Sequence, residues 1–290
     1  MSLATMWLAS LALSLIAGSV QAASAGVNSN NATEGTSSAA ARRSVLQSIP
    51  IDKLDADSRA KVNSVLTNAG IYRRLPIRTV SCDPDLYLFL VRHPDVVVNI
   101  WEILGVAQLQ LRQTDIDTFR ITETEGTVAS LEYLYHSPEL QIVYGKWTYT
   151  GPLLARKING HCLAILKSSY AKQPSGKYYI TARLDGFLSV DSGGLDLLAR
   201  TLQPLMVQNV DNNFIQTVAF LGSMSKTAEV NPEGMKRLAN RLGHVQPQTR
   251  QQLGEVSASV AQRAAANAAS AANSAEPAPR VAGRPQGETE

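Results

Sequence analysis

The sequence predicts an α+β domain in which a curved antiparallel sheet of about six or seven strands wraps on a long C-terminal helix. Three observations predict it. Residues 107–191 contain successive stretches in which apolar and polar side chains alternate with the period of a strand. Only short turns separate these stretches, which favours antiparallel pairing because a parallel pair needs a long crossover. A long amphipathic stretch follows them.

The chain begins with an apolar run that predicts an export signal. Residues 6–20 read MWLASLALSLIAGSV, which is shorter than the roughly 20 apolar residues of a membrane span. The small residues Val20 and Ala22 then suit a cleavage site. We therefore expect residues 1–22 to be a signal peptide and the mature chain to be periplasmic or secreted, without a transmembrane span. No Lys or Arg precedes the run, so an uncut anchor and a buried N-terminal helix stay open as alternatives.

Both flanks of the central region are poor in large apolar residues. Residues 23–43 are mostly Ser, Ala, Asn, Gly and Thr, and residues 244–290 are rich in Gln, Ala, Ser and Pro. Such segments bury too little apolar surface to offset the entropy of ordering them. The sequence therefore predicts a disordered linker, a single globular domain at 44–243 and a low-complexity disordered tail.

Helices and one extended segment precede the predicted sheet. Residues 55–68 predict a short helix with start and stop signals. Residues 71–82 are rich in β-branched side chains, but Pro76 makes the segment irregular or an edge strand. Residues 83–104 predict two short helices, the first capped by Asp83.

The predicted strands and the long helix follow. Alternation and turn residues place the strands at 107–114, 118–124, 127–136, 140–150, 158–171 and 177–190. Residues 195–228 then predict a helix that Pro204 kinks or divides. A last short helix is expected at 232–242.

This order of elements resembles the helix-grip fold of the START and polyketide-cyclase-like (SRPBCC) superfamily. The resemblance covers roughly residues 72–228 and depends most on residues 178–225, where a final strand turns through a Gly pair into the long helix. The helix pair before the sheet also matches. The resemblance implies an apolar cavity between sheet and helix for a lipid, sterol, polyketide or other apolar molecule. It implies no catalytic residue, and the region before Tyr72 lies outside it.

Aromatic side chains concentrate on the predicted strands, where inward-facing ones would line such a cavity. Core packing is the alternative for each of them. Arg183 would meet a ligand carboxylate or phosphate if it faced inward; otherwise it lies in solvent or pairs with Asp185. The candidate ligand-binding residues are Tyr133, Tyr135, Trp147, Tyr149, Arg183, Phe187, Phe214 and Val218.

Two cysteines and four histidines are the remaining reactive side chains. In an exported chain Cys82 and Cys162 suit a disulfide, with two buried free thiols as the alternative. No paired ligand spacing predicts a metal site, and no motif predicts a cofactor. His136 and His161 are available as general bases, but each stands alone in a predicted strand, so we expect no catalytic residue.

Charge is nearly balanced, with 27 Lys plus Arg against 24 Asp plus Glu, and no basic stripe predicts nucleic-acid binding. The function expected from these features is an exported, non-enzymatic protein that holds a lipid or other apolar small molecule. One alternative is a structural or interaction module of the cell envelope with a filled core, whose partners would be envelope proteins. A cyclase or hydrolase-like enzyme is the third.

Overall fold

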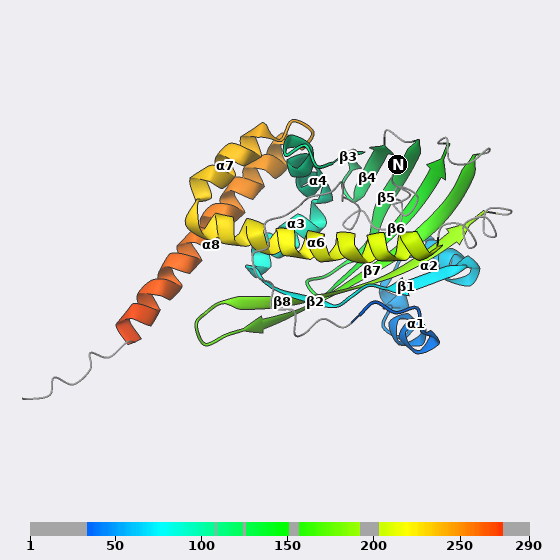
Figure 1. Ribbon diagram of the computed structural model, residues 1–290, viewed down its shortest axis with the longest axis horizontal. Helices are drawn as coiled ribbons and strands as arrows, with labels where there is room; N and C mark the ends of the chain where they lie inside the picture. The colour runs from blue at the N-terminus through cyan, green and yellow to red at the C-terminus, as the bar shows by residue number, and fades with distance from the viewer. Residues whose placement is uncertain (1–33, 108, 124–125, 151–156, 192–202, 275–290) are drawn as a thin grey trace, which may run out of the picture.

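The computed structural model describes residues 34–107, 109–123, 126–150, 157–191 and 203–274 (Figure 1). The expected signal peptide at 1–22 lies outside the described residues, as does the start of the predicted long helix. In the part of the chain that is described, no helix combines the length and apolar character needed to cross a membrane.

One antiparallel sheet of eight strands forms the centre of the fold. Its order is β1-β8-β7-β6-β5-β4-β3, and β2 pairs with β8 beside β1. Neighbours from β3 to β8 are consecutive in the chain, as the short turns predicted. The strands are β1 (Ile71–Arg74), β2 (Arg78–Ser81), β3 (Leu109–Asp115), β4 (Thr118–Glu123), β5 (Thr127–His136), β6 (Leu140–Tyr149), β7 (Ile158–Lys172) and β8 (Tyr178–Val190).

The irregular segment expected around Pro76 is the break between β1 and β2. Both strands pair with β8, Tyr72 opposite Phe187 and Thr79 opposite Thr181. Proline has no N–H to give to the ladder, so pairing stops at Pro76 and resumes after it.

Helices lie on both faces of the sheet (Figure 1). The face that α6 (Gln203–Val230) crosses is called the inner face here, and the opposite face, covered by α1 (Ala39–Leu46) and α2 (Ala56–Asn68), the outer face. The helix pair α3 (Pro84–Arg92) and α4 (Pro94–Ile103) precedes β3, and α7 (Pro232–Arg241) follows α6. The α+β class and the long C-terminal helix against an antiparallel sheet are confirmed, and the arrangement is a helix grip.

Successive side chains of each strand enter different cores. In β8, Ala182 and Leu184 belong to the core beneath α6, whereas Phe187 packs with α1 and α2. The two-residue period of the sequence therefore built two apolar layers, one on each face.

The predicted linker is wrong for residues 34–43. Thr36 exchanges two backbone hydrogen bonds of 2.8 Å with Arg74, and Ser38 caps α1 by accepting from the Ala41 amide. Val45, on the same helix, is fully buried. The segment is ordered because one face of α1 covers the outer core, although its composition is polar.

The predicted disordered tail is wrong for residues 247–274, which form α8 (Pro247–Ser274). Leu253, Ser257 and Val260 are buried, and the Ser257 hydroxyl bonds the Leu253 carbonyl at 2.7 Å. Three positions spaced by three or four residues make a helical stripe. Ser257 and the many alanines hid it, although alanine is the best helix former.

The predicted disulfide is also wrong, because Cys82 and Cys162 are separate buried thiols. Cys82 follows Ser81, which pairs with Tyr179, whereas Cys162 pairs with Leu188. Those two positions of β8 are nine residues apart (188 − 179), about 30 Å along a strand. A disulfide needs Cα atoms within about 7 Å. Burial raises the pKa of the Cys82 thiol to about 12 and also raises that of Cys162, so both stay protonated.

Candidate ligand-binding site

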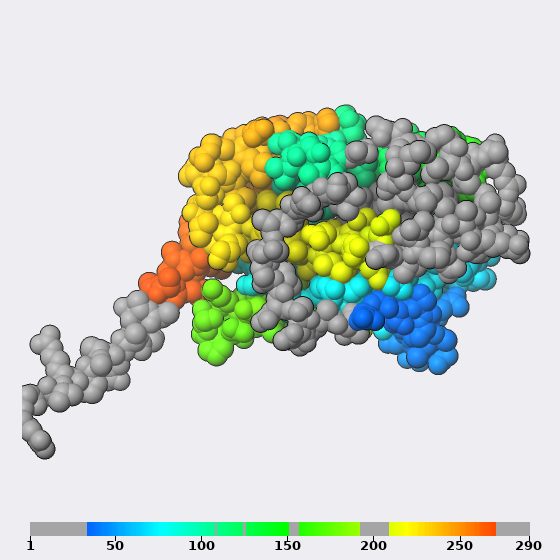
Figure 2. Space-filling model, viewed as in Figure 1, coloured from blue at the N-terminus to red at the C-terminus, as the bar shows by residue number. Residues whose placement is uncertain are grey.

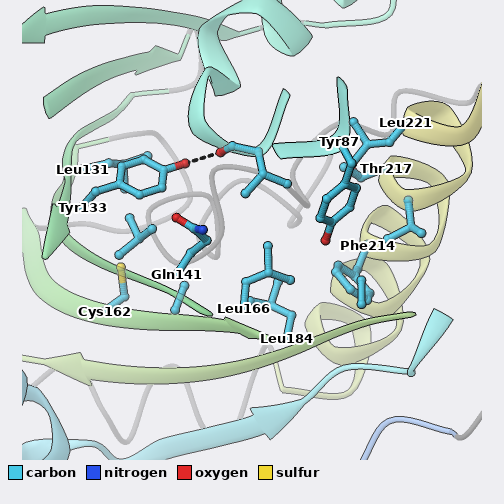
Figure 3. A pocket seen from close by; sticks show the side chains of 15 residues that line it. Tyr87, Leu131, Tyr133, Gln141, Cys162, Leu166, Leu184, Phe214, Thr217 and Leu221 are labelled. Carbon is cyan, nitrogen blue, oxygen red and sulfur yellow. Dashed lines mark hydrogen bonds between the residues drawn. The ribbon is translucent and has the colours of Figure 1, made fainter. Parts of the chain in front are cut away.

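An apolar cavity lies between the inner face of the sheet and α6 (Figure 3). Its volume is about 40 Å³. One water needs roughly 10–15 Å³ on this measure, so the space is that of about three waters. Sites for drug-sized ligands occupy roughly 300–1,000 Å³. The cavity is therefore a narrow seam rather than an open pocket.

The walls come from opposite layers. Leu131, Leu166 and Leu184 reach it from β5, β7 and β8, and Phe214 and Leu221 face them from α6. These side chains converge because alternate strand residues point to the inner face and because the apolar positions of α6 step by three or four residues.

The hydroxyl groups at the cavity are occupied by protein partners. Tyr133 donates to the Val91 carbonyl at 2.5 Å, and Tyr87 and Ser168 share a bond of 2.8 Å. Thr217 donates to the Asn213 carbonyl of its own helix. Burial raises the pKa of both tyrosines, so their hydroxyls stay neutral.

Gln141 on β6 is the exception. Its side chain is only 3% exposed and points into the cavity in Figure 3. Its Nε2 donates to the Ser137 carbonyl in the turn before the strand, which fixes which end of the amide is which. The other end, Oε1, is buried and has no hydrogen-bond partner among the described residues. An unpaired buried acceptor costs about 1–3 kcal/mol, a cost that a donor group placed in the cavity would remove.

Five of the eight expected ligand-binding residues lie on the cavity side. Tyr133, Phe214 and Val218 line the cavity. Trp147 and Tyr149 are buried in the same core but not in the cavity wall. Gly160 leaves room for the Trp147 ring, since a Cβ there would lie 2.4 Å from it.

Tyr135, Arg183 and Phe187 lie away from the cavity. A register shift in β5 between Tyr133 and Tyr135 turns the latter toward the outer core. Phe187 packs with Tyr72 on the outer face, with ring centres 5.0 Å apart. Arg183 is on that face too, its Nε 3.4 Å from Asp185, which is the pairing that the sequence left open.

The sequence analysis did not select Gln141 as a site residue. The signal was present, since Gln141 shares the two-residue phase of Trp147, which was expected to face inward. A polar side chain in an otherwise apolar phase marks a buried amide. Tyr87 on α3 and Thr217 on α6 were missed because they carry no such contrast with their neighbours.

The two strand histidines lie outside the cavity. His136, at the end of β5, approaches Asp117 at 3.9 Å, and His161 shares a 2.7 Å hydrogen bond with the Tyr144 hydroxyl. Over the described ranges, no group of three His, Cys, Asp or Glu side chains is arranged to hold a metal ion. The described side chains around the cavity can thus bind and orient a molecule.

No known protein-family profile matches this chain, and no curated protein matches it significantly. Similar solved structures include a truncated norcoclaurine synthase from Thalictrum flavum, with 10% identity, a TM-score of 0.35, and coverage of 52% of this chain and 93% of that one. A hypothetical protein from Helicobacter pylori is 12% identical, with a TM-score of 0.33, and the match covers 50% of this chain and 84% of that one. The di-domain ARO/CYC StfQ from the steffimycin biosynthetic pathway is 14% identical, with a TM-score of 0.31, and the match covers 65% of this chain and 62% of that one. At these values the likenesses support no inference about activity or ligand.

Proposed function

We propose that this domain binds a small, mostly apolar molecule that carries one hydrogen-bond donor, and holds it without converting it. The observation behind the proposal is the unpartnered Gln141 Oε1 in an otherwise apolar cavity. Apolar walls supply affinity, and one well-placed polar group sets orientation, which is the usual composition of a ligand site.

The size of the cavity sets a condition on the ligand. A molecule with more than a few heavy atoms enters only if the middle of α6 moves away from the sheet. Three polar contacts hold that helix: an ion pair between Arg73 and Asp211, a 2.8 Å bond from the Asp83 amide to the Ser225 hydroxyl, and a 3.7 Å bond from the Cys82 thiol to the Leu221 carbonyl. Phe214 lies between Asp211 and Leu221, so we place the opening there.

Membership of the START and polyketide-cyclase-like superfamily, a lipid as ligand, and export are finer parts of the same proposal. The element order supports the first, and the apolar walls support the second. The apolar run at residues 6–20 supports the third. Cell fractionation with N-terminal sequencing of the mature chain tests export, and a chain retained in the cytoplasm with its first residue intact would refute it.

Binding is tested by native mass spectrometry of the purified protein, followed by titration with a medium-chain alcohol and the alkane of the same length. We expect the alcohol to bind at least about tenfold more tightly, because it can donate to Gln141. Gln141→Leu should abolish that preference and still bind both compounds. Val143→Leu, at the next inward position of β6, is the matched control. Equal affinities for alcohol and alkane in the unaltered protein would refute the role of Gln141, and no binding of either would refute the function.

A second candidate is a cell-envelope interaction module with a filled core. The observation that favours it is the 40 Å³ volume. Ala164 on β7 lines the cavity. If the core is simply filled, Ala164→Val raises stability without loss of function in the cell, whereas in a ligand carrier the same change blocks binding.

A further inference from the structure

The outer face of the β7–β8 hairpin holds two like charges directly opposite each other. Lys167 on β7 pairs in register with Arg183 on β8. Both side chains are partly buried. Like charges facing each other across a strand pair destabilise a sheet. An anion bound beside Lys167 and Arg183 would remove that repulsion.

Among the described residues, too little negative charge lies beside this pair to balance it. Asp185 is the neighbouring carboxylate, and it already accepts from Arg74 Nε at 2.7 Å and from the Tyr72 hydroxyl at 2.7 Å. Arg183 Nε approaches it at 3.4 Å but makes no hydrogen bond. The three cations Arg74, Lys167 and Arg183 therefore lie around the single carboxylate of Asp185.

Lys167 has no hydrogen bond or ion pair with any residue in the described ranges. Glu139, in the turn that leads to the neighbouring strand, instead accepts from the Ser137 hydroxyl at 3.3 Å. Burial and the nearby Arg183 lower the pKa of the Lys167 ammonium, as expected where cations outnumber anions.

Hydroxyl groups continue the same face toward the hairpin end. Ser169 and Thr181 face each other one step beyond the cationic pair. Thr79 on β2 lies beside them, its hydroxyl 2.8 Å from that of Thr181. Two cations next to a row of hydroxyl donors match the oxygens of a tetrahedral anion. The end of this hairpin, at the lower left of Figure 2, lies beside α8, where the Asn267 amide nitrogen is 3.5 Å from the Gly176 carbonyl.

We propose that Lys167 and Arg183, with the hydroxyls of Ser169 and Thr181, form a binding site for a phosphate-class oxyanion on the outer face of the sheet. The cations give charge-assisted bonds to the anion, and the hydroxyls donate to its remaining oxygens. This site is separate from the cavity, which lies on the opposite face.

The test measures binding of inorganic phosphate to the full chain by isothermal titration calorimetry. Vesicles of phosphatidate in phosphatidylcholine, compared with phosphatidylcholine alone, form a second arm. We expect saturable binding in at least one arm. The double variant Lys167→Gln/Arg183→Gln should bind at least about tenfold more weakly, which corresponds to the loss of one charge-assisted hydrogen bond. Binding of free phosphate assigns the site to a soluble anion, and binding confined to phosphatidate vesicles assigns it to a lipid headgroup.

Lys172→Gln/Lys177→Gln is the matched control, because it removes the same charge from the end of the same hairpin. The single variant Lys167→Gln keeps the Arg183–Asp185 contact, so it separates loss of the anion from loss of the fold. Equal weakening by the two double variants, the same heat with sodium chloride as with phosphate, or no binding in either arm would overturn the proposal.

Discussion

The two faces of the sheet use buried polar groups in opposite ways. On the outer face Asp185 is fully buried, and both of its oxygens are bonded, one to Tyr72 and Arg74 and the other to Arg74 again at 3.3 Å. On the inner face Gln141 is nearly as buried, yet one end of its amide has no partner in the described chain. A satisfied network stabilises the fold, whereas an unsatisfied group in a cavity is a cost that a ligand can remove. The Asp185 network therefore stabilises the fold, and the unpaired end of Gln141 marks the inner face as a place where an apolar ligand can bind.

The largest effect should come from breaking the outer network. Asp185→Asn leaves Arg74 buried without its counter-charge, and we expect a loss of about 3–5 kcal/mol in the free energy of unfolding. Urea denaturation measures it. Arg263→Gln is the control, because this half-exposed partner of Asp83 should cost below about 1 kcal/mol. A loss of similar size in both variants would remove the distinction between the outer network and a surface pair.

A second effect concerns Asp95 on α4, which is fully buried with neither carboxylate oxygen hydrogen-bonded within the described part of the chain. Burial raises its pKa from the usual 3.8 to about 6. The folded state then holds the proton more tightly than the unfolded state, so stability from this group is present at low pH and is lost as pH rises from about 4 through about 6. The loss is on the order of 3 kcal/mol.

His93 has the opposite pH dependence, because burial lowers its pKa to about 4. The stability that neutral His93 contributes is therefore lost as pH falls from about 6.5 towards 4. The difference between the unaltered protein and Asp95→Asn isolates the carboxyl group. We expect this variant to be more stable at pH 7 and to lose the advantage near pH 4. A difference that does not change with pH would show that the carboxylate is solvated or paired.

A smaller effect of opposite sign to that of Asp185→Asn is expected at Gln141. Replacement by leucine removes the unpaired acceptor from the cavity, and we expect the ligand-free protein to gain about 1 kcal/mol. Thermal denaturation after delipidation measures this. Loss of stability instead would mean that the bond to the Ser137 carbonyl outweighs the unpaired oxygen, and the contrast between the faces would fail.

The smallest effect belongs to the like-charge pair on the outer face. Lys167→Gln removes repulsion with Arg183, so in phosphate-free buffer we expect a gain of about 0.2–1 kcal/mol. High salt should reduce the gain, because it screens exposed charges. Destabilisation at low salt would show that Lys167 has a partner.

The sheet and α6 were predictable because their burial follows simple periods. β3, β4 and most of β5 alternate between buried and more exposed side chains, and the apolar positions of α6 step by three or four residues. The α1 and α8 helices were not predictable from composition. Their buried faces use small residues such as Ala41 and Ser257, whose apolar contribution appears only once neighbouring helices cover them.

The candidate site was partly predictable for the same reason. The phase of β5 correctly places Tyr133 inward, but a register shift then reverses it before Tyr135. A bulge adds one residue and moves every later side chain to the other face. No short pattern in YLYH announces it. The pairing of Arg183 with Asp185, in contrast, follows from their positions two residues apart on one strand.

The position of β1 and β2 beside β8 has a consequence for how the chain folds. Ile71 pairs with Leu188, 117 residues later (188 − 71), whereas β3 to β8 pair with their immediate successors. Closing a long loop is entropically costly and slow, and it follows the formation of local contacts. We expect the β3–β8 meander to form first, leaving the far edge of β8 without partners. The segment from α1 to β2 then docks last, so a chain emerging in order would leave residues 39–81 undocked until almost the whole sheet had been made.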